Sequence, residues 1–124
     1  MAGVVRNYHN GQLMEEYFEN DGKKEGEYKL YWWGGQLREI CSYTGGSREG
    51  KYQRYYRNGH LFESYSYNEG KMHGRYMSFH ESGKLWETSS YTNGVMDGEY
   101  KSYDDRGQLQ KIVNFDDEDL WEKN

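Results

Sequence analysis

Four glutamates recur along the chain at a constant spacing and are the first candidates for chemistry. Two carboxylates at a suitable separation can perform acid–base catalysis, as in glycoside hydrolysis. A column that recurs with every structural unit is better explained by cross-strand partners such as Arg6, Arg54 and equivalent Lys or Ser positions. We therefore predict that the chain has no catalytic residues and is not an enzyme. The four positions are Glu15, Glu39, Glu63 and Glu87.

The histidines and the cysteine do not follow a recognisable metal-ligand pattern. Cys41 has no Cys-x-x-Cys companion, and no His-Glu-x-x-His spacing occurs. The acidic run from Asp116 to Asp119 lacks the glycine and the alternation of a calcium loop and is typical of a solvated tail. The glycines never open a helix, so no phosphate loop is indicated. The sequence predicts neither a metal nor a cofactor. The four histidines are His9, His60, His73 and His80.

Aromatic residues make up 18% of the chain, and tyrosine alone contributes 14 residues. Several are larger than their positions in the repeat described below require. Exposed aromatic stripes mark partner sites, although the same side chains can also pack within a twisted sheet or against neighbouring hairpins. We take them as candidate partner-binding residues while both readings stay open. They are Trp32, Trp33, Tyr56, Phe62, Trp86 and Trp121.

Composition narrows the class of protein and of partner. The 124 residues and 34% hydrophobic content favour one domain with a small, single-sided core. The net charge of −5 disfavours nucleic acid and anionic membrane lipid as partners, since both are bound by concentrated Lys and Arg. The lone cysteine, together with an N-terminus that lacks the apolar run of a signal peptide, favours a reducing compartment, and we expect the cytoplasm.

The elements that must position these residues follow a 24-residue repeat. Thirteen of the 16 glycines obey this period, and the chain contains no proline. Such self-similarity is the signature of a repeat architecture. The glycine columns are Gly11, Gly35, Gly59, Gly83, Gly107; Gly22, Gly46, Gly70, Gly94; and Gly26, Gly50, Gly74, Gly98. Further columns are Leu13, Leu37, Leu61, Leu85, Leu109; Tyr28, Tyr52, Tyr76, Tyr100; and Tyr31, Tyr55, Phe79, Tyr103.

Each repeat has the pattern of a β-hairpin. In the third, residues 50–57 and 60–67 flank Asn58-Gly59, the strongest short hairpin signal. A two-residue turn there pairs Tyr56 with Leu61 and places the leucine column on the face of Tyr52. The opposite face would then carry the Tyr55 column. Beside that column we expect Ile40, Phe62, Trp86 and Ile112.

The ends of the chain depart from the pattern, as the ends of a repeat array should. We assign residues 1–115 to the array and residues 116–124 to an acidic cap or tail. Trp121 either folds back over the last strand or docks against a second copy in a homodimer, and the sequence leaves both open. About ten antiparallel strands are expected from five stacked hairpins, because one hairpin alone is marginal.

The recurring Tyr-x-Asn-Gly-x-Leu and Tyr-x-x-Gly-Lys-x-x-Gly-x-Tyr motifs of residues 56–79 resemble the MORN repeat, in the variant form of bacterial antitoxin-like proteins and large DNA viruses. The resemblance implies a trough-like all-β sheet and a role in protein–protein interaction or scaffolding, with self-association as one route. An antitoxin-like neutraliser of a basic partner protein is the sharper hypothesis. A carbohydrate or peptide-ligand binding surface is the alternative.

Overall fold

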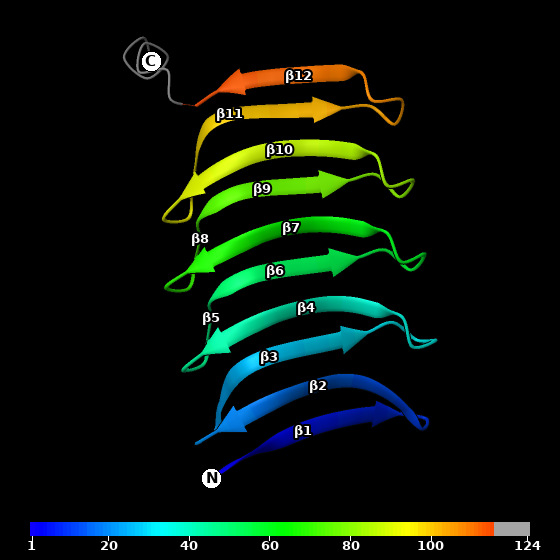
Figure 1. Cartoon of the computed structure of the whole chain (residues 1–124), viewed down its shortest axis with the longest axis vertical. Coiled ribbons are helices and arrows are strands. Elements are labelled where there is room, and N and C mark those ends of the chain that lie inside the picture. Colours follow the sequence, from blue (N-terminus) through cyan, green and yellow to red (C-terminus); the bar gives the residue numbers. More distant parts are fainter. Residues whose placement is uncertain (116–124) are drawn as a thin grey trace.

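The computed structural model describes residues 1–115, which form strands joined by short connections (Figure 1). No helix occurs in these residues, so the described part of the chain holds no helix able to span a membrane. The strands are β1 (Ala2–His9), β2 (Gln12–Asn20), β3 (Lys23–Tyr31), β4 (Leu37–Thr44), β5 (Ser47–Arg48), β6 (Gly50–Tyr55), β7 (Leu61–Asn68), β8 (Lys71–Met72), β9 (Gly74–Phe79), β10 (Leu85–Thr92), β11 (Val95–Tyr103) and β12 (Leu109–Asn114).

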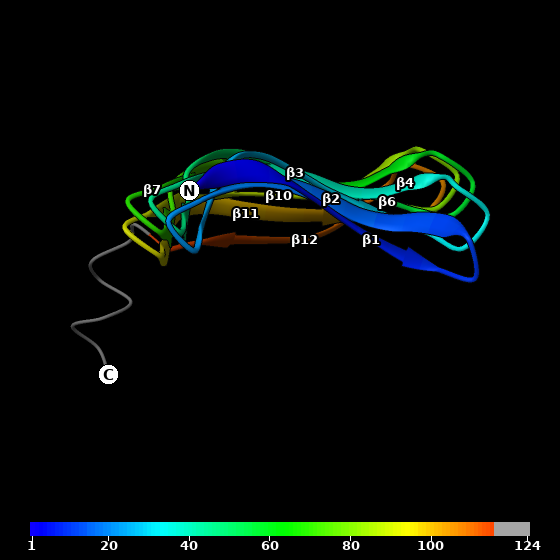
Figure 2. The same ribbon diagram turned by 90° about the horizontal axis from the view of Figure 1, so that it is seen from below.

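All strands belong to one antiparallel sheet in which chain neighbours are also spatial neighbours. Its path is β1-β2-β3-β4-β6-β7-β9-β10-β11-β12, with the short β5 and β8 paired to β4 and β7. The predicted array of about ten antiparallel strands is therefore confirmed. Seen from below, the sheet is a single curved layer with both faces uncovered (Figure 2). β1 and β12 lie at its two open edges.

On one side of the sheet, drawn on the left in Figure 1, the ends of the strands are joined by two-residue turns. Their central residues all have positive φ, as in Glu69 (51°) and Gly70 (81°), which defines type I′ turns. Two of these turns bond the strand that follows the preceding turn, since Gly46 N donates to Lys24 O and Gly94 N to Met72 O at 3.0 and 2.8 Å. We call this side the turn edge. Its turns are Asp21-Gly22, Gly45-Gly46, Glu69-Gly70 and Asn93-Gly94.

The opposite side, the loop edge, differs from the prediction. Only Asn10-Gly11 among the described connections on this side is a two-residue turn, with His9 paired to Gln12. In the third hairpin Tyr56 N donates to His60 O and Gly59 N to Tyr56 O, so the loop has three residues. The predicted pairing of Tyr56 with Leu61 is wrong because this loop places Tyr55 opposite Leu61. The three-residue loops are 33–35, 57–59, 81–83 and 105–107.

A β-bulge follows each loop and changes which residues share a face. Tyr55 pairs with Leu61 and Arg54 with Glu63, so Phe62 is an extra residue. Leu61 therefore lies on the face of Tyr55, not on that of Tyr52, and Phe62 lies beside Tyr56. The predicted faces of the leucine column and of Phe62 and Trp86 were wrong for this reason. We call the face that carries Tyr28, Tyr52, Tyr76 and Tyr100 the tyrosine face.

The core is small, as the composition predicts. Tyr28, Cys41 and Tyr52 are buried on the tyrosine face, and tyrosines of neighbouring strands pack against them. Burial of the thiol raises the pKa of Cys41 to about 11, with the Glu39 carboxylate as the next cause. The predicted C-terminal cap at 116–124, with Trp121, lies outside the described residues.

Replacing Gly59 with alanine tests the loop geometry. Gly59 has φ +92° and open space around an added Cβ, so only backbone strain opposes the change. We expect Gly59→Ala to lower the free energy of unfolding by about 1–2 kcal/mol in urea denaturation. Gly3→Ala is the matched control, because Gly3 has equal space and no positive φ. Equal effects of the two substitutions would contradict the positive φ of Gly59.

Candidate functional site: the tyrosine face and its aromatic ridge

The glutamate column binds one hairpin to the next on the tyrosine face. Tyr28 donates its hydroxyl proton to Glu15 at 2.5 Å, where Glu15 belongs to β2 and Tyr28 to β3. The same bond, from a tyrosine 13 residues after the glutamate, joins Tyr76 to Glu63 at 2.7 Å and Tyr100 to Glu87 at 2.6 Å. The period thus places a charge-assisted hydrogen bond at three junctions between hairpins.

A second donor reaches each of these carboxylates from the preceding strand. Arg54 forms an ion pair with Glu63 at 2.9 Å, as the sequence predicts. Asn7 donates to Glu15 and Ser78 to Glu87. Arg6 instead bonds Glu16 at 2.6 Å, so its predicted pairing within the glutamate column was wrong.

Three phenols of this face, those of Tyr28, Tyr65 and Tyr76, have a raised pKa and stay protonated well above neutral pH. The pKa values of Tyr28 and Tyr76 are raised far above 10, first by burial and second by the hydrogen bond to a glutamate. Burial and the hydroxyl of Tyr67 do the same for Tyr65. The face therefore presents neutral phenols as donors and glutamates as acceptors.

Two cations of the chain lie over tyrosine rings near the turn edge. Lys24 Nζ lies 5.1, 4.9 and 5.2 Å from the ring centroids of Tyr17, Tyr28 and Tyr43. One repeat later, the Arg48 guanidinium lies over Tyr52 and Tyr67 at 4.9 and 5.6 Å and donates to the Tyr67 hydroxyl. A cation over several ring faces is attracted by their quadrupoles.

Large side chains form a second stripe beside the loop edge, which we call the aromatic ridge. Trp32, Tyr56 and His80 occupy one column and each reaches a carbonyl of the next repeat. Trp32 Nε1 donates to Tyr55 O, and Tyr56 Oη donates to Phe79 O. His80 Nε2 lies 2.8 Å from Tyr103 O. These contacts repeat every 24 residues and give the ridge a structural role whatever else it does.

The bulge residues complete the ridge. Phe62 contacts Tyr56 with ring centroids 4.8 Å apart, and Trp86 stacks on His80 at 5.1 Å. In the second repeat Arg38 takes this position and lies over Trp32. The bulge that moved Phe62 and Trp86 away from their predicted face therefore brings them onto the candidate site.

The structure gathers five of the six predicted partner-binding residues near the loop edge. Trp33 and Trp86 are exposed at 49% and 37% of their surfaces. Trp32, Tyr56 and Phe62 are half-buried within the ridge, so packing accounts for part of their size. Trp121 lies outside the described residues. The binding role of all six stays a prediction.

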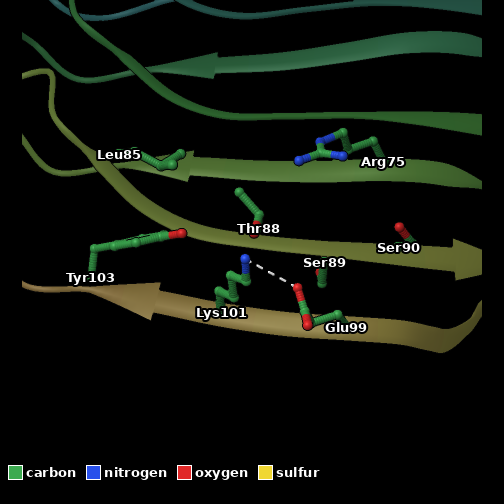
Figure 3. A pocket seen from close by; sticks show the side chains of 8 residues that line it. All are labelled: Arg75, Leu85, Thr88, Ser89, Ser90, Glu99, Lys101 and Tyr103. Atoms are coloured by element: carbon green, nitrogen blue, oxygen red, sulfur yellow. Dashed lines mark ion pairs between the residues drawn. The ribbon is translucent and has the colours of Figure 1, made fainter. Parts of the chain in front are cut away.

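The opposite face offers a shallow polar hollow of about 230 Å³ over β9 to β11 (Figure 3). Lys101 pairs there with Glu99 at 3.1 Å, and Leu85 and Tyr103 border it. Its charged groups are partly matched among themselves, so this hollow has no strong preference for one sign of charge.

The histidines and acids of residues 1–115 form no group of three or more that could hold a metal ion. His60 and His80 contact backbone carbonyls, and His9 packs edge-on against Trp33.

The comparison with protein families decides how the repeat is classified. The model of the MORN repeat variant matches residues 48–69, 72–93 and 96–117, three successive stretches whose starts are 24 residues apart. The chain belongs to the MORN repeat variant family. Each MORN match begins just after a type I′ turn and encloses one three-residue loop. The second hairpin has the same construction, the first has a two-residue turn in place of the loop, and both precede the matched residues.

Two solved structures are similar to this chain at low identity and low TM-score. One contains accessory secretory proteins 1, 2 and 3 of Streptococcus pneumoniae, at 12% identity and a TM-score of 0.45, with 80% of this chain and 18% of that chain covered. The other is the GtfA/B complex bound to UDP and GlcNAc, at 14% identity and a TM-score of 0.37, covering 91% and 24%. This chain thus spans a quarter or less of either protein. A search of curated proteins found no match.

Removing one hydroxyl tests the bond between hairpins. Tyr76→Phe leaves the nearly buried Glu63 without one of its donors. We expect the free energy of unfolding to fall by about 2 kcal/mol in urea denaturation. Tyr8→Phe, on a ring that is 61% exposed, is the control and should change it by less than about 0.5 kcal/mol. Similar losses in both variants would contradict the role of the column.

Alkaline titration provides a test of the buried phenols. The folded pKa values of Tyr28 and Tyr76 exceed their ordinary 10.0, so the unfolded chain loses these protons first. Each of these groups contributes its full stabilisation below its unfolded-state pKa. This contribution is lost as the pH rises towards the folded-state pKa. We expect the urea midpoint to fall from about pH 10 upward, starting near pH 9 through Cys41. A midpoint that stays constant to about pH 11.5 would contradict burial of these groups.

Proposed function

We propose that this chain is a non-enzymatic protein-binding module whose tyrosine face and aromatic ridge hold a basic partner protein. Membership in the MORN repeat variant family indicates a repeat protein that acts in binding or interaction. The partner's chemistry is the further step, and the composition of one face supports it.

The observation that carries the proposal is the alignment of carboxylates and aromatic rings along the sheet. Glutamates of β2, β4, β7 and β10 occupy equivalent positions, and tyrosines flank them in every repeat. Two tryptophans extend this surface at the loop edge with a third or more of their area exposed. Aromatic anchors with surrounding charge are typical of the residues that dominate protein interfaces.

Charge favours a basic partner over an acidic one. The chain has 21 acidic and 16 basic residues, of which residues 116–124 contribute five acidic and one basic, and this surplus would attract a cationic protein over a distance of about 8–10 Å at moderate salt. An antitoxin-like neutraliser, which covers the functional surface of a basic protein, is the specific form of this proposal. The acidic surplus and the likeness to the variant repeats of antitoxin-like proteins support it.

The state of the carboxylates favours binding over catalysis. Glu15, Glu63 and Glu87 each accept one bond from a tyrosine and another from the preceding strand. Acceptors held by two donors are suited to fixing a surface and poorly suited to carrying protons in turnover.

Affinity capture from the native host tests the proposal. The wild-type chain, a Trp33→Ala/Trp86→Ala variant and a Val95→Ala control would be compared, since Val95 is 68% exposed at the turn edge. We expect a basic protein, identified by mass, that binds the purified chain about tenfold more weakly in the tryptophan variant and dissociates as salt rises. The Val95→Ala chain should bind like the wild type.

Three outcomes would overturn the proposal. One is a monomeric chain in native lysate with no retained partner. Another is an acidic partner whose affinity does not depend on salt. The third is a second copy of this chain as the retained protein, which would assign the surface to self-association.

A further inference from the structure

The junction between the third and fourth hairpins contains the same kind of tyrosine cage that holds Lys24 at the junction between the first and second, without a lysine in it. In the first cage Tyr17 and Tyr28 stack with centroids 5.8 Å apart at 27°, and Tyr28 and Tyr43 meet edge-on at 5.8 Å and 69°. In the third, the equivalent pairs are 5.5 Å at 31° and 6.2 Å at 67°. The rings of this third cage are Tyr65, Tyr76 and Tyr91.

Met72 stands where the first cage has its lysine. The two residues occupy the same place in the repeat, because Lys24 is paired with Glu19 and Met72 with Tyr67 at equivalent registers. Methionine is apolar and flexible, so it lines the cage without supplying charge. The third cage therefore has no cation in the position that Lys24 occupies in the first cage.

The space beside Met72 is open. A cavity of about 290 Å³ is lined by the three rings of this cage and extends to Met96 and Tyr100, with Glu63 and Glu87 at its border. Ser89 explains part of this opening, because it occupies the column in which Tyr17 and Tyr65 carry rings. A small residue at this position leaves room that a ring fills elsewhere.

Ser89 also presents a polar atom with nothing to bind. The residue is 3% exposed, and its hydroxyl oxygen has no hydrogen-bond partner among residues 1–115. Buried polar atoms are almost always satisfied, and Ser89 borders both this cavity and the hollow on the opposite face, so its unpaired hydroxyl is a secondary observation beside the rings and carboxylates.

The carboxylates give the cavity its sign. Glu15 and Glu39 adjoin the first cage, which also holds the ammonium group of Lys24. Glu63 and Glu87 adjoin the third, where Arg54 pairs with Glu63 while Glu87 is bonded by the neutral hydroxyls of Ser78 and Tyr100. Three ring faces and a carboxylate without a cation form a site suited to a positively charged group.

We propose that the cage of Tyr65, Tyr76 and Tyr91 binds the alkylammonium group of a lysine side chain from a partner protein. The lysine side chain of the partner would enter beside Met72 and occupy the position that Lys24 has in the first cage. This inference deepens the proposed function and rests on it in one respect, because the lysine belongs to the proposed partner protein.

Titration with n-butylammonium chloride tests the site with no partner present. Tyrosine ring resonances of the wild-type chain would be followed by NMR, with n-butanol as the neutral probe. We expect n-butylammonium to shift the resonances of the third cage and n-butanol to bind at least tenfold more weakly. Equal binding of the two probes, or no shift with either, would overturn the proposal.

Two substitutions at equivalent positions sharpen the result. Met72→Lys should fill the third cage from within, as Lys24 fills the first, and weaken n-butylammonium binding at least tenfold. Lys24→Met should open the first cage and add a second set of shifting resonances. Val95→Lys adds the same charge on an exposed residue and should leave the third-cage shifts as in the wild type.

The two arms keep the proposal testable if one variant fails to fold. Wild-type affinity in folded Met72→Lys would overturn it, as would the absence of new shifts in folded Lys24→Met. A Gly-Ser-Lys-Ser-Gly peptide and its norleucine counterpart then identify the source of the amine. Binding of the lysine peptide supports a polypeptide ligand, whereas binding of n-butylammonium alone would overturn the lysine assignment and leave a free amine. If the chain retains a partner protein but does not bind n-butylammonium, the proposed function stands and only the lysine site in this cage is rejected.

Discussion

The contact between one hairpin and the next is the constraint on which the rest of this protein depends. A two-stranded hairpin is marginal in water, and the core here contains only a few fully buried side chains in any part of the described sheet. Stability therefore has to come from junctions between hairpins. Backbone pairing joins β4 to β6 and β7 to β9, and the Tyr76 hydroxyl adds its bond to Glu63 across the second of these.

The same contacts that hold the array also create its surface. Because the bond from tyrosine to glutamate recurs at three of the junctions between hairpins, a stripe of rings and carboxylates runs across the strands. Substitution at one position of the repeat then changes the local chemistry while the backbone keeps its course. Lys24, Arg48 and Met72 show this, since the first two place a cation over tyrosine rings and the third does not.

Much of the fold could be predicted from the sequence because glycine and tyrosine report the repeat directly. Positive φ at the type I′ turns explains a column such as Gly22 to Gly94, and strand number and order follow from the period. The register at the loop edge could not be predicted from Asn58-Gly59 alone. The residues that argue against a two-residue turn are Ser82 and Arg106, which occupy the position of Asn58 in the next two repeats. A type I′ turn needs positive φ at both central residues, and these side chains disfavour positive φ.

The candidate site was predicted in part. The large aromatics were singled out one by one, but Phe62 and Trp86 were placed on the face opposite Tyr56. The bulge that brings them beside it has no signature in residue type, since Met14, Arg38 and Gln110 occupy the same position. The third cage was missed because its distinctive residues are ordinary ones. Comparing Met72 with Lys24 along the column would have revealed it.

Residue-resolved amide hydrogen exchange tests most directly whether the hairpins form one continuous sheet. The account predicts that amides of β4, β6, β7 and β9 are strongly protected and exchange with a common free energy, while β1 and β12 exchange faster at the open edges. Rapid exchange at the β4–β6 and β7–β9 junctions, with protection confined to individual hairpins, would contradict it.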